Sequence, residues 1–202
     1  MAIVSFSTED DYRVPFEPST PGFSIVPFGD ADALEKAITP ETVAFLVEPI
    51  QGEGGIIIPP DGYLKRVREI CTKHNVLFLA DEVQTGLGRT GKMFAFDHEG
   101  VTPDIIILGK ALGGGLLPVS ACVGTKPVMS VLQPGEHGST FGGMPLSMTV
   151  AIEALDILLE EKLAERAAAL GEKVVRKLTD AKLPGVRAVR GRGLLIGVEF
   201  ED

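Results

Sequence analysis

The chain has 202 residues, of which 45% are hydrophobic and 23% charged, proportions typical of a globular protein rather than a disordered one. Its formal net charge is -9. This charge argues against nucleic acid or an anionic membrane as a partner, because their phosphates require a basic protein face. No apolar run approaches the roughly 20 residues of a membrane span, and the first residues lack the basic flank and apolar core of a signal peptide. The two cysteines, Cys71 and Cys122, indicate no disulfide framework and fit a reducing compartment. We therefore expect a cytoplasmic protein.

The first forty residues give weak structural signals. Residues 3–6 are compatible with a short strand, and the proline-rich stretch 13–22 predicts a loop. Residues 30–38 predict a short helix that Asp30 caps and that Thr39-Pro40 closes.

From residue 43 the pattern alternates between strand and helix. Residues 43–47 form a continuous apolar run, as expected of a strand covered on both faces, and residues 76–80 form a second run. Between them a 3.6-residue apolar period predicts a helix capped by Asp61. Its expected apolar face contains Tyr63, Leu64, Val67, Ile70, Cys71 and His74. This order predicts two neighbouring parallel strands.

The second half of the chain changes character near residue 160. Residues 104–108 and 119–123 predict two more strands, and residues 145 to about 182 predict helix with a break around 160–162. Residues 186–189 and 194–200 then predict a strand pair. We therefore expect an α/β fold with a mainly parallel sheet, as a partial large domain over 1–160 followed by the beginning of a small α+β domain over 161–202.

Residues 86–91 match the pattern G-x-G-x-x-G, and residues 86–92 match the start of a phosphate-binding P-loop. A P-loop requires Ser or Thr next, and this chain has Met93. A dinucleotide-binding loop requires a helix directly after the glycines, but residues 94–100 show no clear helical face. For these glycines alone we favour a mobile surface loop over a nucleotide-binding loop.

Two side chains at the ends of apolar runs suggest chemistry. Asp81 follows the run 76–80, and Lys110 follows the run 105–108. Ligands of open α/β sheets bind just past the carboxyl ends of the strands. A lysine desolvated there is a nucleophile towards an aldehyde, and a carboxylate can hold the pyridinium nitrogen of pyridoxal phosphate. The alternatives are a lysine that points to water and an aspartate that caps a helix or lies in a solvated loop.

Several ordered motifs around these residues carry a family resemblance. They are IVSFS at 3–7, EPIQGEGG at 48–55, DEVQTG at 81–86, GRTG at 88–91, Pro103-Asp104, GKAL at 109–112 and HGSTFGG at 137–143. Together they resemble the class III aminotransferases, and within that class the ornithine aminotransferases. The resemblance extends over nearly the whole chain and implies a dimeric, fold-type I enzyme that depends on pyridoxal 5'-phosphate. It predicts no metal site.

The resemblance also implies roles for individual residues. Lys110 would form the Schiff base with the cofactor and later move the proton, and Asp81 would hold the pyridinium proton. Val83 would pack on the ring, and Gln84 would bond the phenolic oxygen of the ring. Ser139 and Thr140 would bind the phosphate of the neighbouring subunit's cofactor. Glu53 would gate the arginine that binds the substrate carboxylate, and Glu48 would be an acidic residue near the cofactor. A purely structural carboxylate remains the alternative for Glu48.

The chain also departs from the family pattern. Family members are about twice as long, and this sequence contains neither the upstream Gly-Ser/Thr phosphate loop and stacking aromatic residue nor the downstream arginine for the substrate carboxylate. Arg192 does not match that arginine. Met144 stands where the family has asparagine. Because each lost charge-assisted bond to the phosphate weakens binding by about 1.5–3 kcal/mol, we expect the isolated chain to bind the cofactor weakly and to be inactive or weakly active.

The expected reaction is transfer of the terminal amino group of L-ornithine to a 2-oxo acid, giving glutamate semialdehyde and an amino acid. Acetylornithine and 4-aminobutyrate aminotransferases share these motifs, so these amine donors stay open. A second, non-catalytic interpretation is a truncated remnant that serves as a fold or interaction module.

Overall fold

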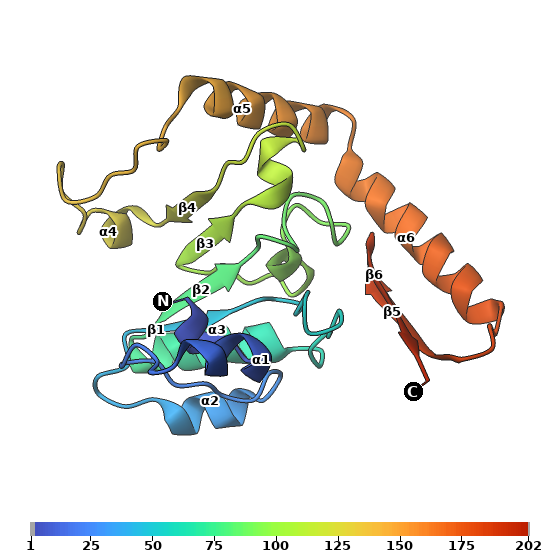
Figure 1. Ribbon diagram of the computed structural model, residues 1–202, viewed down its shortest axis with the longest axis horizontal. Helices are drawn as coiled ribbons and strands as arrows, with labels where there is room; N and C mark the ends of the chain where they lie inside the picture. Colours follow the sequence, from blue (N-terminus) through green and yellow to red (C-terminus); the bar gives the residue numbers. More distant parts are fainter. Residues whose placement is uncertain (1–2, 202) are drawn as a thin grey trace. The chain divides into compact units, whose positions relative to one another are not determined.

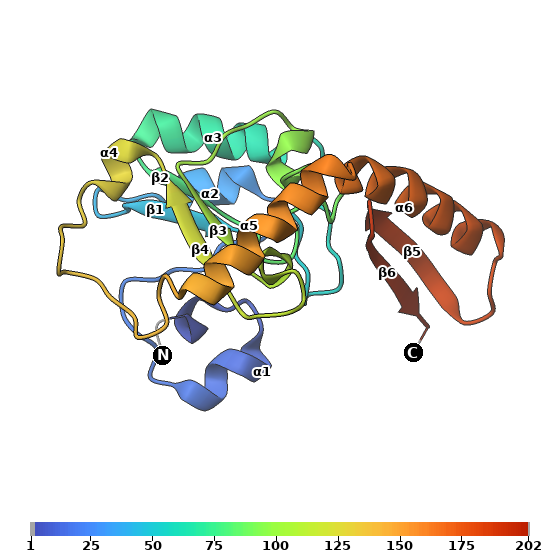
Figure 2. The same cartoon turned by 90° about the horizontal axis from the view of Figure 1, so that it is seen from above.

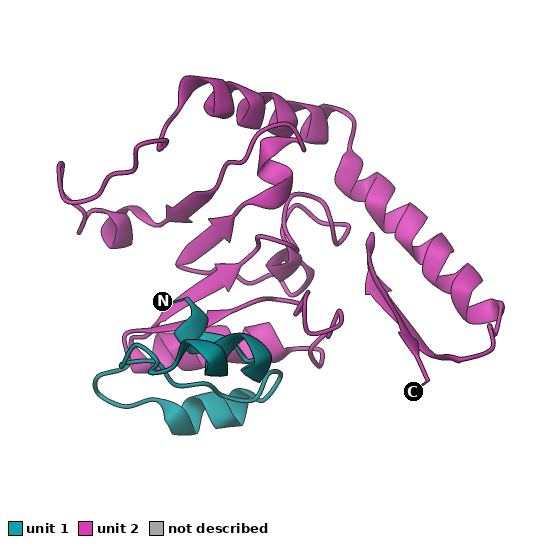
Figure 3. Ribbon diagram, viewed as in Figure 1, with its two compact units in different colours: residues 1–42 teal, residues 43–202 magenta. Residues whose placement is uncertain are grey.

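The computed structural model describes residues 3–201, in two compact units that divide between residues 42 and 43 (Figure 3). The first unit contains the 3-10 helices η1 (Val4–Phe6) and η2 (Val14–Phe16) and the helices α1 (Asp10–Arg13) and α2 (Ala31–Ala37). The predicted division near residue 160 stays a prediction.

The first unit confirms the predicted helix, whereas residues 13–22, which were predicted to be a loop, begin with the last residue of α1 and include all of η2. The Asp30 carboxylate accepts a hydrogen bond from the Ala33 amide at 2.8 Å, so Asp30 caps α2 as expected. The strand predicted at residues 3–6 is wrong. Ile3 has helical backbone angles, and the Ser7 amide donates to the Val4 carbonyl at 3.1 Å. These local bonds satisfy the backbone without a neighbouring strand.

The second unit is built on a four-stranded sheet in the order β1-β2-β3-β4 (Figures 1 and 2). Its strands are β1 (Ala44–Val47), β2 (Leu77–Asp81), β3 (Ile105–Leu108) and β4 (Ala121–Gly124). The first three are parallel, and β4 is antiparallel to β3. The predicted strands and their mainly parallel arrangement are therefore confirmed. As a result, β1, β2 and β3 end at the same edge of the sheet.

The coverage of the strands differs from the expectation. β1 is an edge strand whose first residue is exposed, and along β2 the buried Phe78 and Ala80 alternate with half-buried neighbours. The expectation that residues 43–47 form a strand covered on both faces is therefore wrong.

Helix α3 (Tyr63–His74) connects β1 to β2 and buries most of its predicted face. Its N-cap is Gly62, with φ +83°, and not the predicted Asp61, which is exposed. A left-handed residue at this position favours glycine. His74 also departs from the prediction because it lies on the exposed last turn. Beyond the helix, Arg68 and the Phe78 amide both bond Asp104, each at 2.7 Å, so Asp104 joins α3, β2 and the start of β3.

The predicted long helix is two helices, α5 (Pro145–Glu160) and α6 (Leu163–Asp180), joined at the expected place (Figure 2). Lys162 has φ +52°, which breaks the helical path. α5 contributes Ala151 and Leu158 to a buried apolar cluster that also contains Leu87, Leu108 and Leu112. α6 packs against the predicted strand pair, the hairpin of β5 (Val186–Arg192) and β6 (Leu195–Phe200). The remaining elements are the 3-10 helices η3 (Ala95–His98) and η4 (Lys110–Gly113) and the short helix α4 (Lys126–Met129).

Residues 86–91 do not form the mobile surface loop that was expected. Most of this segment is buried, and its Arg89 carbonyl accepts from the Leu194 amide at 2.8 Å. A Cβ on Gly91 would lie 2.8 Å from the Ala168 Cβ, and a Cβ on Gly193 would lie 2.4 Å from the Thr90 carbonyl carbon. The glycines therefore allow backbone contact with α6 and the hairpin. Because η3 follows instead of an α-helix, the dinucleotide-loop interpretation has no structural support.

Candidate functional site

Lys110 follows β3 by two residues and begins η4. Its backbone is left-handed, with φ +43°, a conformation that is costly for a residue other than glycine and that gathers at functional sites. Its ammonium nitrogen Nζ lies 4.0 Å from Oε1 of Glu53, and its side chain is 55% exposed. The expectation of a desolvated lysine is therefore not met by these residues, although the lysine is placed at the strand ends as predicted.

Asp81 is the last residue of β2 and pairs with Ile107 of β3. Its Oδ1 accepts a hydrogen bond from the Val83 amide at 3.0 Å. Val83 in turn lies beside the backbone before Lys110, since a Cβ on Gly109 would be 3.4 Å from Val83 Cγ1. The carboxylate, the apolar side chain and the lysine therefore lie at the ends of adjacent strands.

Gln84 and Glu53 meet on the same side of the site. The Gln84 side-chain amide donates to Glu53 Oε1 at 2.8 Å, the oxygen that also faces Lys110. A Cβ on Gly52 would lie 2.7 Å from Gln84 Cδ, so glycine at position 52 provides the space that Gln84 occupies. Glu53 thus connects Lys110 and Gln84.

Glu48 directly follows β1 and is half-buried. Its Oε2 accepts from the Gly52 amide at 3.0 Å. Burial raises the pKa of Glu48, the Gly52 hydrogen bond opposes this, and then the nearby Asp81 carboxylate raises it while the Lys110 ammonium lowers it. Glu48 therefore feels the charges of the same cluster and also fixes the turn after β1. Glu48 therefore fits both interpretations, an acidic group near the cofactor and a structural carboxylate.

Ser139 and Thr140 lie apart from these residues. Both are exposed, in the long connection between α4 and α5 (Figure 1). Within residues 3–201, no hydrogen bond or ion pair joins either one to Asp81, Gln84 or Lys110. The structure thus brings together six of the eight predicted residues and leaves these two elsewhere.

Comparison with known proteins decides the family. The family described as aminotransferase class-III matches residues 1–202. The chain belongs to the class-III aminotransferases. This confirms the resemblance, and the mainly parallel α/β fold agrees with it.

Individual class-III relatives agree in sequence and in structure. Ornithine aminotransferases of Exiguobacterium and Bacillus cereus are 57% and 55% identical over all of this chain. The chain covers 50% and 51% of them, and so spans about half the length of these curated relatives. The ornithine aminotransferase from Toxoplasma gondii superimposes with a TM-score of 0.95 at 50% identity, over 99% of this chain and 48% of that one. A second structure of that enzyme holds PLP at partial occupancy in its active site.

An acetylornithine aminotransferase from Elizabethkingia anophelis is also similar, with a TM-score of 0.87 and 51% identity. The alignment covers 91% of this chain and 49% of that one. Structural similarity therefore extends across amine donors within the class-III aminotransferases.

Glu82 is a buried residue that the sequence analysis missed. Its side-chain oxygens accept from Thr85 Oγ1 at 2.5 Å and from the Phe96 amide at 3.1 Å. Burial raises the pKa of Glu82 to about 7, against the lowering effect of these bonds. A sequence signal existed, because the strand alternation of Phe78 and Ala80 points residue 82 inward as well. In this class-III aminotransferase Glu82 connects the end of β2 to η3.

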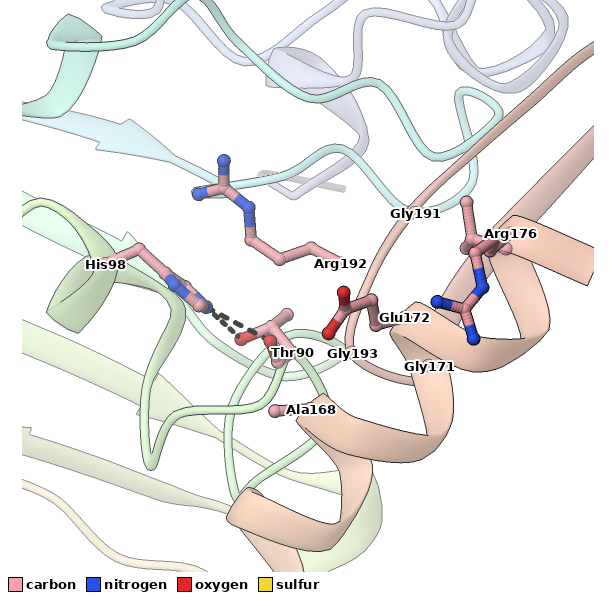
Figure 4. Close-up of a pocket in the computed structure, with 10 residues that line it drawn as sticks. Thr90, His98, Ala168, Gly171, Glu172, Arg176, Gly191, Arg192 and Gly193 are labelled. Atoms are coloured by element: carbon pink, nitrogen blue, oxygen red, sulfur yellow. Dashed lines mark hydrogen bonds between the residues drawn. The ribbon is translucent and has the colours of Figure 1, made fainter. Parts of the chain in front are cut away.

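A hollow of about 410 Å³ lies elsewhere, between η3, α6 and the hairpin turn (Figure 4). His98 lines it and bonds the Thr90 carbonyl at 3.1 Å, while burial and then the Arg192 guanidinium lower the pKa of His98. The guanidinium groups of Arg176 and Arg192 point away from each other. The residues that line it are Thr90, His98, Ala168, Gly171, Glu172, Val175, Arg176, Gly191, Arg192 and Gly193. Because these charges do not converge, we do not assign the site of the class-III aminotransferase here.

The described residues also bear on the membrane question. No helix within residues 3–201 is both long and apolar enough to cross a membrane.

Proposed function

We propose that this chain supplies the cofactor-ring side of a pyridoxal phosphate-dependent aminotransferase of the ornithine aminotransferase type. The reaction transfers the terminal amino group of L-ornithine to a 2-oxo acid. The observation that carries this proposal is the gathering of Asp81, Val83, Gln84, Glu53 and Lys110 at the ends of parallel strands. The identity of over half to known ornithine aminotransferases supports the choice of substrate.

The side chains present fit the cofactor ring. Pyridoxal phosphate supplies an aldehyde that captures amines and a protonated ring that withdraws electrons. Lys110 offers a primary amine to that aldehyde, and Asp81 a carboxylate to the ring N–H. Oδ1 of Asp81 is held by the Val83 amide, which orients the carboxylate. Val83 would pack on the ring face, and Gln84 would bond the ring oxygen.

Proton transfer is assigned to Lys110. Its Nζ would be the base that takes up the proton from the substrate carbon and holds it for return during the transfer. The amine lies 4.0 Å from the Glu53 carboxylate, and its side chain is open to solvent.

The two glutamates belong to the substrate side. Glu53 would pair with the arginine that binds the substrate carboxylate, which lets one site accept both a terminal amine and an α-amino acid. Glu48 would add negative charge next to Asp81. In support of these roles, Oε1 of Glu53 lies 4.0 Å from Lys110 Nζ, and the Glu53 side chain is exposed.

A homodimer completes the proposal. Ser139 and Thr140 are exposed, and within residues 3–201 no hydrogen bond or ion pair joins them to Lys110. Hydroxyls placed in this way suit the phosphate of a cofactor bound by a second subunit. The isolated 202-residue chain, with Lys110 55% exposed, is therefore expected to bind the cofactor weakly.

The test is covalent capture of the cofactor. The chain is incubated with pyridoxal phosphate, reduced with borohydride and digested, and the labelled peptide is mapped by mass spectrometry. We expect label at Lys110, complete loss of that label in Lys110→Ala, and full label in the control Lys126→Ala. Label spread evenly over exposed lysines would contradict the proposal and favour a non-catalytic remnant.

The amine donor is tested separately. Acetylornithine is the second candidate, because the Elizabethkingia anophelis enzyme is 51% identical. Single-turnover spectra of the cofactor-loaded protein with ornithine or acetylornithine distinguish the two. A faster spectral change with acetylornithine would replace ornithine in the proposal.

A further inference from the structure

Arg190 of β5 reaches from the hairpin to a backbone turn next to Lys110. Its Nε donates to the Gly55 carbonyl at 2.8 Å and is 3.1 Å from the Ile56 carbonyl. Its Nη1 bonds the Glu199 carboxylate on β6. The guanidinium is planar and its donors have fixed directions, so the carboxylate bond orients the group that holds the two carbonyls.

The turn that Arg190 holds is strained. Ile56 has φ +56°, which is unfavourable for a β-branched residue. The amides of Gly55 and Ile56 both bond the Gly52 carbonyl, at 3.1 and 3.2 Å. The hairpin also presses on the turn, since a Cβ on Gly197 would lie 3.2 Å from the Ile56 Cβ. Such a conformation persists only where its surroundings impose it.

The same turn carries Glu53. Its Oε1 accepts from the Gln84 amide at 2.8 Å and lies 4.0 Å from Lys110 Nζ. Glu53 is exposed, so few side-chain contacts fix it. The position of its carboxylate therefore depends on the backbone of the turn.

We propose that Arg190 is a positioning residue of the site. It holds the turn over residues 52–57 in its strained form and so keeps the Glu53 carboxylate between Gln84 and Lys110. The importance of Arg190 for transamination rests on the proposed function. The physical coupling between Arg190 and Glu53 does not depend on that function.

Arg187 provides a matched control. It lies on the same strand, and its Nη1 pairs with Oε1 of the same Glu199 at 3.0 Å. Its side chain is more exposed than that of Arg190, and none of its bonds among the described residues reaches the turn. Replacing it weakens the hairpin's ion pairs without touching residues 52–57.

The first measurement is amide hydrogen exchange in the 202-residue chain. We expect Arg190→Gln to speed exchange at Ile56 and Ile57 by about tenfold or more, because two bonds to backbone carbonyls are lost. Arg190→Lys keeps the charge near Glu199 but not the planar donor, and should give a smaller increase. Arg187→Gln should leave both amides within about twofold of the parent. Amides of α3 report whether each variant is folded.

The second measurement follows the effect to Glu53. The chain has three glutamines and one asparagine, so its side-chain amide signals in a ¹⁵N spectrum are few and Gln84→Ala assigns the one of interest. We expect Glu53→Gln and Arg190→Gln each to shift the Gln84 signal, and the double variant to shift it no further than Glu53→Gln alone. Arg187→Gln should not shift it.

Three outcomes would overturn the proposal. These are unchanged exchange in Arg190→Gln, equal acceleration in Arg187→Gln, or additive shifts in the double variant. Neither measurement uses the cofactor. Absence of label at Lys110 would therefore reject the proposed function, whereas the coupling between Arg190 and Glu53 is decided by amide exchange and by the Gln84 signal alone.

Discussion

The ring-side cluster around Asp81 and Lys110 and the segment with Ser139 and Thr140 are built differently. The first is held at the ends of strands, and its supporting Phe78, Ala80 and Glu82 are buried. The second is exposed and bonded mainly within itself, as in the bond from the Gly142 amide to the Ser139 carbonyl. The strand ends thus orient their side chains through contacts within the chain, whereas the exposed connection leaves the hydroxyls of Ser139 and Thr140 open to solvent.

We expect the greatest loss of stability when a phenylalanine is replaced by alanine in the sheet, and almost none when the same change is made in the exposed connection. Phe78→Ala opens a cavity on the buried face of β2, the strand that ends at Asp81, and should lower the free energy of unfolding by about 3–5 kcal/mol. Phe141, which is 78% exposed, lies next to Thr140, and Phe141→Ala should change it by less than about 0.5 kcal/mol. Urea unfolding followed by circular dichroism measures both. Similar losses for the two variants would show that the connection is as well packed as the sheet.

A smaller effect concerns pH and Glu82. Burial raises its pKa in the folded chain to about 7, above the ordinary 4.5, so folding favours the protonated acid. Its contribution to the unfolding free energy is therefore greatest below pH 4.5 and falls as pH rises towards 7. We expect a decrease on the order of 1–3 kcal/mol between pH 5 and 8. Urea unfolding across this range should show a flatter profile for Glu82→Gln, and an unchanged slope would remove Glu82 as the cause.

The smallest effect on stability is expected from the exposed hydroxyls. Ser139→Ala and Thr140→Ala should leave the unfolding free energy within about 0.5 kcal/mol of the parent. In an assembled dimer, the same changes should each weaken pyridoxal phosphate binding by about 1.5–3 kcal/mol, because a bond to a charged phosphate is lost. Equilibrium titration with the cofactor measures this, with Ser130→Ala as the control hydroxyl. Weakened binding by a strictly monomeric chain would place the hydroxyls in their own subunit's site instead.

Local signals predicted much of the fold and the placement of Asp81 and Lys110 at the ends of neighbouring strands. Continuous apolar runs located β2 and β3, and therefore Asp81 and Lys110 at their ends. The Asp30 cap was predictable because its bond to Ala33 is local. In each case the information lies within a few residues of the feature it determines.

The errors arose where distant contacts decide the outcome. The glycines of residues 86–91 looked mobile, but their backbone touches α6 and Gly193, about a hundred residues later. The exposure of Lys110 depends on the groups that surround it. The position of a residue at the end of a strand does not show what those groups are. Glu82 was missed although the alternation of Phe78 and Ala80 points it inward, because its bond to the Phe96 amide, fourteen residues later, is not visible in the sequence pattern.

The bond from Arg190 to Gly55 also has a consequence for the order of folding. Its partners are 135 residues apart in the chain. Local helices such as α3 form before such remote contacts, whose loop closure is entropically unfavourable. During synthesis we therefore expect the Glu53 turn to be held only by its bonds to earlier residues, such as Glu48 and Gln84, until residue 190 has left the ribosome. We expect the sheet edge that presents Asp81 and Lys110 to form earlier, and the turn beside it to gain its bonds from Arg190 in a later step.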